Sequence, residues 1–130
     1  MRTTFRAAFM LTMSLAFASA AAAQQTTLPQ GVTAAMIAQG ETLFKGPGIC
    51  TACHGADAKG VPGLGANLTD DEWLHSDGSY EGIVNTVTHG VTSDKSSSGT
   101  VMPPKGGSQL TDDQVRAVAA YVWSLSHHGT

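Results

Sequence analysis

The sequence predicts a small all-α domain. Two observations carry this prediction: apolar residues recur at helical spacing in three stretches of the 130-residue chain, and helix-capping residues precede the first and the last of them. A third is negative, because no stretch shows the alternation of apolar and polar residues that would form a sheet. The length fits one domain with a limited core.

The first stretch predicts a helix from Thr33, which can cap it, to about Phe44 or Lys45. Its apolar positions are Met36, Ile37, Gly40, Leu43 and Phe44. A glycine in a helix costs stability when exposed, so we expect Gly40 to let another helix approach closely. Gly46-Pro47-Gly48 should end the helix.

The middle of the chain begins with a glycine-rich loop over residues 56–67. Thr69-Asp70-Asp71-Glu72 has the pattern of a capping box and predicts a short helical piece bearing Trp73 and Leu74. A second helix is expected over residues 79–89, with Gly90 following its end.

The last helix should start at the capping box Thr111-Asp112-Asp113-Gln114 and run to about Ser126. Residues 91–101 before it are rich in Ser, Thr and Gly and predict an exposed loop. We expect the first and last helices to cross where Gly40 meets Tyr121.

The N-terminus has the pattern of an export signal. Arg2 and Arg6 precede an apolar run that ends in alanines and is shorter than a membrane span, so cleavage is expected after Ala23 or, as second choice, after Ala20. The predicted organisation is a signal peptide at 1–23, a flexible leader at 24–31, one domain at 32–126 and a tail at 127–130. The rest of the chain contains no transmembrane candidate.

The charge of the chain excludes one class of partner. Its formal net charge is −3, and removing Arg2 and Arg6 with the signal makes it more negative. Nucleic-acid binding needs clustered basic surface, so no nucleic-acid partner is expected.

The motif Cys50-Thr51-Ala52-Cys53-His54 is the centre of the functional prediction. Cys50, Cys53 and His54 stand at positions i, i+3 and i+4, which share one face of a helix. Two thiols on one face can each add to a vinyl group of a single haem, and the neighbouring imidazole can reach its iron.

Three other interpretations of the motif compete. Zinc needs about four ligands, and the sequence has no further cysteine. A thioredoxin-type pair usually lies near a βαβ pattern, which is missing here. A simple disulfide in an exported protein stays possible.

The whole pattern resembles the class I c-type cytochromes. The resemblance rests on Gly40 and Phe44, the Cys50–His54 motif, Met102-Pro103 and Tyr121, in that order. The segment 67–74, together with Ile83 and His89-Gly90, resembles the haem domains of the cbb3-type oxidase dihaem subunit. Residues 92–100 form a longer polar connection than is usual in that subgroup, and the chain has a single haem motif.

The resemblance implies a small cytochrome c fold wrapped around one haem c, attached through Cys50 and Cys53. It implies that His54 and Met102 bind the iron. It further implies that the Pro62 carbonyl accepts from the other ring nitrogen of His54. The remaining expected haem contacts are Leu64 and Leu68 at the haem edge and Trp73 near a propionate.

Met102 also stands out by its position, because it lies between a flexible loop and two prolines where no helix requires its side chain. A thioether ligand raises the potential of haem iron relative to a second imidazole. His89 competes for this role, and His75 competes more weakly.

We therefore expect a periplasmic single-electron carrier that is not an enzyme, with respiratory redox proteins as partners and a monomeric state. The alternatives are a haem c subunit of an oxidase or dehydrogenase complex and, less favoured, a peroxidase or gas-binding protein. Four lysines near the motif and Met102 could form a local basic rim or be ordinary solvated lysines; they are Lys45, Lys59, Lys95 and Lys105.

Overall fold

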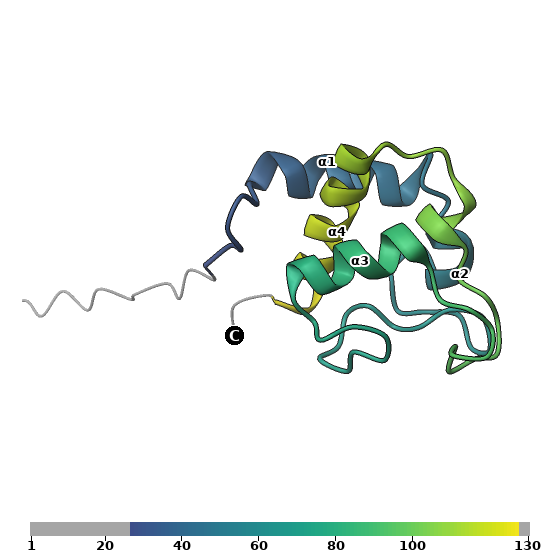
Figure 1. The fold of residues 1–130 in the computed structure, drawn as a ribbon. Helices are drawn as coiled ribbons and strands as arrows, with labels where there is room; N and C mark the ends of the chain where they lie inside the picture. Colours follow the sequence, from purple (N-terminus) through teal and green to yellow (C-terminus); the bar gives the residue numbers. More distant parts are fainter. Residues whose placement is uncertain (1–26, 128–130) are drawn as a thin grey trace, which may run out of the picture.

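The computed structural model describes residues 27–127, so the predicted signal peptide and all but the first residue of the predicted tail lie outside the described residues. In chain order the helices are α1 (Ala34–Lys45), α2 (Thr51–His54), α3 (Tyr80–His89), the 3-10 helix η1 (Pro104–Gly107) and α4 (Asp112–Ser126), as Figure 1 shows. Residues 27–127 contain two isolated β-bridges and no longer strand. The all-α prediction is confirmed.

Side-chain caps start the three long helices. Thr33 accepts a hydrogen bond from the Met36 amide, and Ser79 accepts one from the Gly82 amide. Thr111 forms a complete capping box with Gln114. Each cap satisfies an amide that the first turn leaves without a helical partner.

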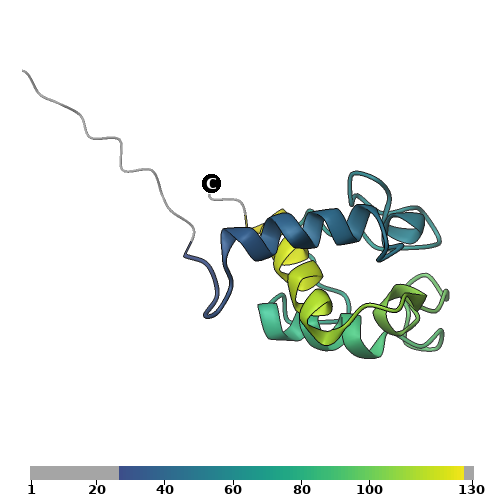
Figure 2. The same ribbon diagram turned by 90° about the horizontal axis from the view of Figure 1, so that it is seen from above.

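The framework consists of α4 packed between α1 and α3, which Figure 2 shows from above. Gly40 of α1 is buried where the two terminal helices cross. A Cβ added at Gly40 would overlap the carbonyl oxygen of Ala117 and lie 2.8 Å from Cβ of Tyr121. The predicted crossing of Gly40 and Tyr121 is therefore confirmed, and the absent side chain is what allows it.

Aromatic and branched side chains fill the space beside this crossing. The rings of Phe44 and Tyr121 meet edge to face with centroids 5.4 Å apart. Phe44, Val115 and Val118 are the largest side chains that are almost wholly buried. This core holds the end of α1, and so the start of the Cys50–His54 motif, in place.

The prediction of a short helix after Thr69 is wrong, because the structure has no helix between α2 and α3. The Asn67 side chain accepts from the amide and the hydroxyl of Thr69, at 2.9 and 2.8 Å. The Asp70 carboxylate accepts from the Glu72 amide. These local bonds occupy the groups that a capping box would use, so the chain turns without forming a helix.

Among the helices of residues 27–127, none has the length and hydropathy of a membrane-spanning helix.

Candidate functional site

The Cys50–His54 motif lies on one short helical turn. The amides of Cys53 and His54 both donate to the Cys50 carbonyl, at 3.2 and 2.9 Å. The turn begins after α1 ends, where the Gly48 amide donates to the Leu43 carbonyl at 2.8 Å. A Cβ at Gly48 would lie 2.7 Å from that carbonyl and 3.2 Å from the Cys50 sulfur, so only glycine lets the chain turn this tightly.

Both cysteines are free thiols. Burial raises the pKa of the Cys50 thiol, which donates weakly to the Gly48 carbonyl at 3.4 Å. Within residues 27–127 no three His, Cys, Asp or Glu side chains are grouped to hold a metal ion. Neither the zinc nor the disulfide interpretation gains support from this arrangement.

Two adjoining cavities open beside the motif. The first is lined mainly by apolar side chains of the core and of the 66–76 loop, and the second extends from the motif towards residues 96–103. They contain about 710 and 870 Å³ of space free of protein atoms, part of it open to solvent. Six residues line both cavities: Cys50, His54, Ala66, His75, Met102 and Gly106.

The His54 ring is oriented by a hydrogen bond from its Nδ1–H to the carbonyl of Ala66, at 2.9 Å. The proton on Nδ1 leaves the Nε2 lone pair available for a metal. The resemblance implied the Pro62 carbonyl for this contact, and in the structure Ala66 provides it. Pro62 lies on the exposed turn between Val61 and Gly65, which form a β-bridge. Nothing in the sequence distinguished the Ala66 carbonyl from others in this loop.

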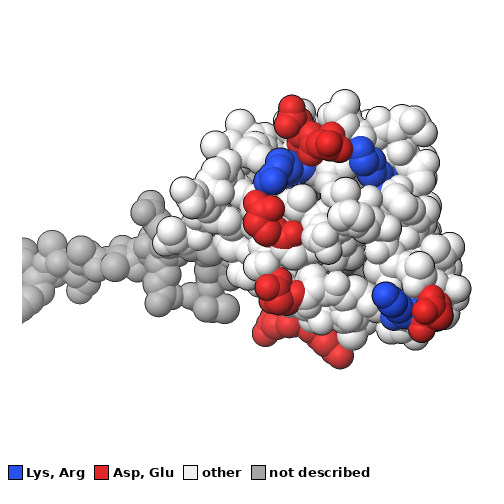
Figure 3. Space-filling model, in the orientation of Figure 1, with Lys and Arg blue, Asp and Glu red and all other residues white. Residues whose placement is uncertain are grey.

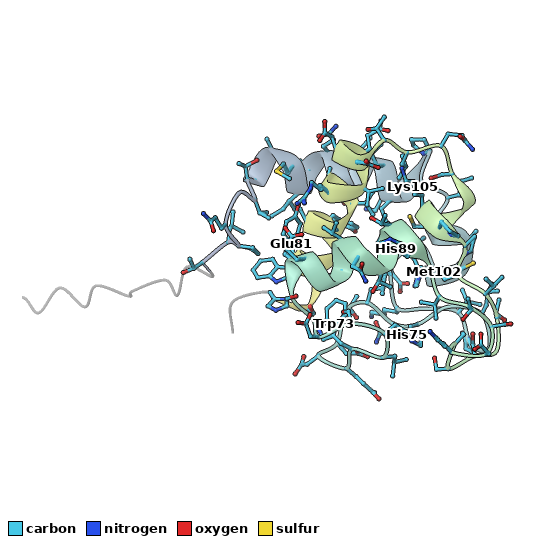
Figure 4. The ribbon with its side chains drawn as sticks, viewed as in Figure 1. Trp73, His75, Glu81, His89, Met102 and Lys105 are labelled. Atoms are coloured by element: carbon cyan, nitrogen blue, oxygen red, sulfur yellow. The ribbon has the colours of Figure 1, made fainter. Side chains whose placement is uncertain are left out.

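Met102 is held by its backbone against Val91. The Val91 amide donates to the Met102 carbonyl at 2.8 Å, and the Met102 amide donates to the Val91 carbonyl at 2.9 Å. Gly90, with φ of +72°, ends α3 so closely that a Cβ there would overlap the Met102 carbonyl. This clamp places the half-buried Met102 side chain on the wall of both cavities (Figure 4).

The other predicted contact residues divide between the cavities. Leu68 and Trp73 are half-buried and line the first cavity, and Leu64 lines the second. His89 is exposed, is not among the residues lining either cavity, and has Nδ1 3.0 Å from the Asn85 carbonyl. His75, the weaker candidate in the sequence, is exposed and lines both cavities.

Two of the lysines near the site form ion pairs. Lys45 binds Glu41 at 2.6 Å, which raises the pKa of Lys45. Lys105 donates to Asp112 and to the Leu110 carbonyl, both at 2.9 Å, and lowers the pKa of the Asp112 carboxyl. Two of the four lysines proposed as a basic rim are therefore neutralised, which weakens that prediction.

Residues 35–122 match the family described as "Cytochrome C oxidase, cbb3-type, subunit III". The chain belongs to this family. Residues 50–54, 102 and the crossing of α1 with α4 all lie within the matched range. Family membership confirms the resemblance to class I c-type cytochromes and identifies the cofactor class as haem c.

Similar proteins agree with this assignment. The chain is 42% identical to the cbb3-type oxidase subunit CcoP of Rubrivivax gelatinosus over 69% of its length, covering 26% of that protein. It is 41% identical to subunit FixP of Rhizobium etli over 70% of its length, covering 31% of that protein. The chain thus spans about a quarter to a third of these relatives.

A solved structure also shares the fold. Cytochrome cL of Methylophaga aminisulfidivorans superposes with a TM-score of 0.56 at 28% identity, over 73% of this chain and 56% of that one. A haem c electron-transfer domain is the functional class that these comparisons support.

Proposed function

We propose that the chain is a periplasmic single-electron carrier with one haem c, attached through Cys50 and Cys53 and bound by His54 and Met102. The observation that carries the proposal is that all four side chains line the second cavity, although His54 and Met102 are 48 positions apart in the chain. Two thiols, an imidazole and a thioether are the donor set that haem c attachment and ligation require.

The lining of the first cavity fits the same cofactor. Phe44, Leu68, Ile83, Val87, Val118 and Val122 make it apolar, as a macrocycle requires. Haem iron supplies one-electron chemistry when it is bound. Cys50 and Cys53 would hold the haem by adding each S–H across one vinyl group, an addition that needs no external oxidant.

The residues of the chain then set the properties of the carrier. The Ala66 carbonyl fixes the His54 tautomer, and the Val91 clamp limits the freedom of Met102. The apolar wall excludes water, and the thioether favours reduced iron. If His54 and Met102 both hold the iron, they would leave no position for a substrate, so we propose a role in transfer and not in catalysis.

Mass spectrometry of the acid-denatured holoprotein tests the attachment, because haem held by two thioether bonds stays with the peptide bearing Cys50 and Cys53. A redox titration with optical spectra tests the ligation, and we expect the weak far-red sulfur-to-iron band in the oxidised protein. Haem that extracts into organic solvent from a disulfide-bonded protein would overturn the proposal. Sequencing the N-terminus of the exported protein tests cleavage at Ala23.

A second candidate function is a haem c subunit of a respiratory oxidase or dehydrogenase complex. Its support is that the similar curated proteins are named as cbb3-type oxidase subunits. Co-purification of the tagged chain from mild detergent distinguishes the two: a carrier elutes as a monomer, and a subunit elutes with the complex.

A further inference from the structure

The mouth of the second cavity is unusually apolar. Five large apolar side chains are exposed within residues 27–127, and three of them line this one cavity. They are Ile49, Leu64 and Val101, which are 53%, 36% and 52% exposed. Apolar side chains gathered at one place on a surface indicate an interaction site.

The same mouth is uncharged. No Lys, Arg, Asp or Glu is among the residues that line the second cavity, and its outer wall is completed by the hydroxyl side chains of Ser96, Ser97, Ser98 and Thr100. In Figure 3 acidic side chains gather at the top and lower left of the face, one basic and one acidic side chain lie next to each other at the lower right, and the area over Met102, which Figure 4 labels in the same view, is white. The side chains that line the opening thus include no acid and no Lys or Arg, and the nearest charges in the chain, Asp94 and Lys95 before Ser96, are opposite in sign.

The hydroxyl-bearing wall is fixed to the motif side of the cavity. Ser98 Oγ donates to the Leu64 carbonyl at 3.4 Å, and Thr100 Oγ1 donates to the Gly63 carbonyl at 3.2 Å. These contacts join segments that are more than thirty residues apart in the chain. The uncharged mouth is thus a preformed surface and not a set of independent loops.

We propose that this neutral mouth, formed by Ile49, Leu64, Val101 and residues 96–100, is the docking surface for a redox protein whose own contact surface is apolar and uncharged. The proposal rests on the proposed electron-carrier function. Cys53 lines the mouth, so a partner docked here would lie close to a haem attached at Cys53. A charged partner surface would lose hydration here without gaining an opposite charge, which disfavours it.

Electrodes with defined surfaces replace the partner in the test. Holoprotein is placed on gold bearing methyl-, carboxylate- or ammonium-terminated monolayers, and the interfacial electron-transfer rate is measured by voltammetry. We expect the fastest transfer on the methyl surface. The rate there should stay constant from about 0.01 M to about 1 M salt, although the Debye length falls from about 30 to 3 Å.

Two variants test the residues. Val101→Glu introduces a charge into the mouth, and Ile49→Asn removes apolar surface at a position with φ of +59°, which asparagine tolerates. Each should lower the rate on the methyl surface by about tenfold at the variant's own midpoint potential. Leu28→Glu is the matched control, since Leu28 is also exposed, at 38%, but is not among the cavity-lining residues. Its rate should equal that of the wild type.

The outcomes separate this proposal from the proposed function. Equal rates on all three surfaces, fastest transfer on a charged surface, or equal loss in Leu28→Glu would overturn the docking surface while leaving the carrier intact. A wild-type dimer in sedimentation that Val101→Glu dissociates would make the occupant a second copy and also overturn it. Protein without a haem signal on any electrode would instead refute the carrier itself.

Discussion

Replacing Gly40 by alanine should destabilise the protein, although the same change at an exposed helical site would stabilise it. An exposed glycine costs a helix about 1 kcal/mol relative to alanine. At Gly40 the new Cβ would overlap the Ala117 carbonyl oxygen and lie 2.8 Å from Tyr121 Cβ, where carbon atoms normally stay about 3.5–4.0 Å apart. Both neighbours are fixed by α4, so the two helices would have to separate.

The magnitude follows from these opposing effects. Overpacking costs about 1–3 kcal/mol, and here it acts on backbone atoms that cannot rotate away, so the upper part of the range applies. Subtracting the gain in helix propensity leaves a net loss of about 1–2 kcal/mol. For a domain of this size each kcal/mol lowers the melting temperature by about 4–8 °C, which gives a decrease of about 5–15 °C. Gly40→Val should be worse.

Thermal unfolding of the holoprotein, followed by circular dichroism, measures the effect. Ala38→Gly is the matched control, because Ala38 is exposed on the same helix and reports the cost of a glycine without packing. We expect both variants to melt below the wild type. If Gly40→Ala instead melts higher, by about as much as Ala38→Gly melts lower, then the close approach at Gly40 is not what holds α1 against α4.

Three further predictions concern the proposed iron ligand Met102, the ion pair between Lys105 and Asp112, and a helix cap. Met102→Ala should lower the potential, remove the far-red band and allow carbon monoxide to bind, whereas His89→Ala should change none of the three; loss of the band in the histidine variant would reverse the assignment. Asp112, with a pKa lowered by Lys105, stabilises the fold above its unfolded pKa of about 3.9 and loses this effect as the pH falls through the lower folded value. Asp112→Asn should therefore melt below the wild type at neutral pH and equal to it in strong acid, and a difference that persists in acid would contradict the pairing. Thr111→Ala should cost about 1 kcal/mol in chemical unfolding, and an unchanged midpoint would mean that its capping box is dispensable.

The sequence was most informative where one residue acts through local chemistry. Thr33 and Thr111 start helices as predicted, and Gly90 ends one, because capping and positive φ depend on a few neighbouring atoms. Gly40 could be placed at a helix crossing because an unexplained glycine in an apolar stripe has few other uses.

The sequence failed where several local bonds compete or where the partner is a backbone group. Thr69 begins the same capping-box pattern as Thr111, but its amide and hydroxyl both donate to the Asn67 side chain instead. Every residue has a carbonyl, so the choice of Ala66 over Pro62 as the acceptor for His54 depends on the path of the loop. Lys105 looked like a free surface charge until the turn at η1, where Lys105 itself has φ of +55°, brought it to Asp112.

The paired backbone bonds between Val91 and Met102 have a consequence for how the chain can vary. Val91 and Met102 are bonded to each other, so residues 92–101 form a loop whose two ends are held together by this backbone pair. Lengthening this loop costs closure entropy of about 0.6 kcal/mol for each doubling, in addition to the loss of any bond from Ser98 or Thr100 to the Leu64 and Gly63 carbonyls. A reporter peptide grafted near Gly99, where the backbone has open space, would thus leave the sulfur of Met102 in place, although it would stand in the proposed docking surface.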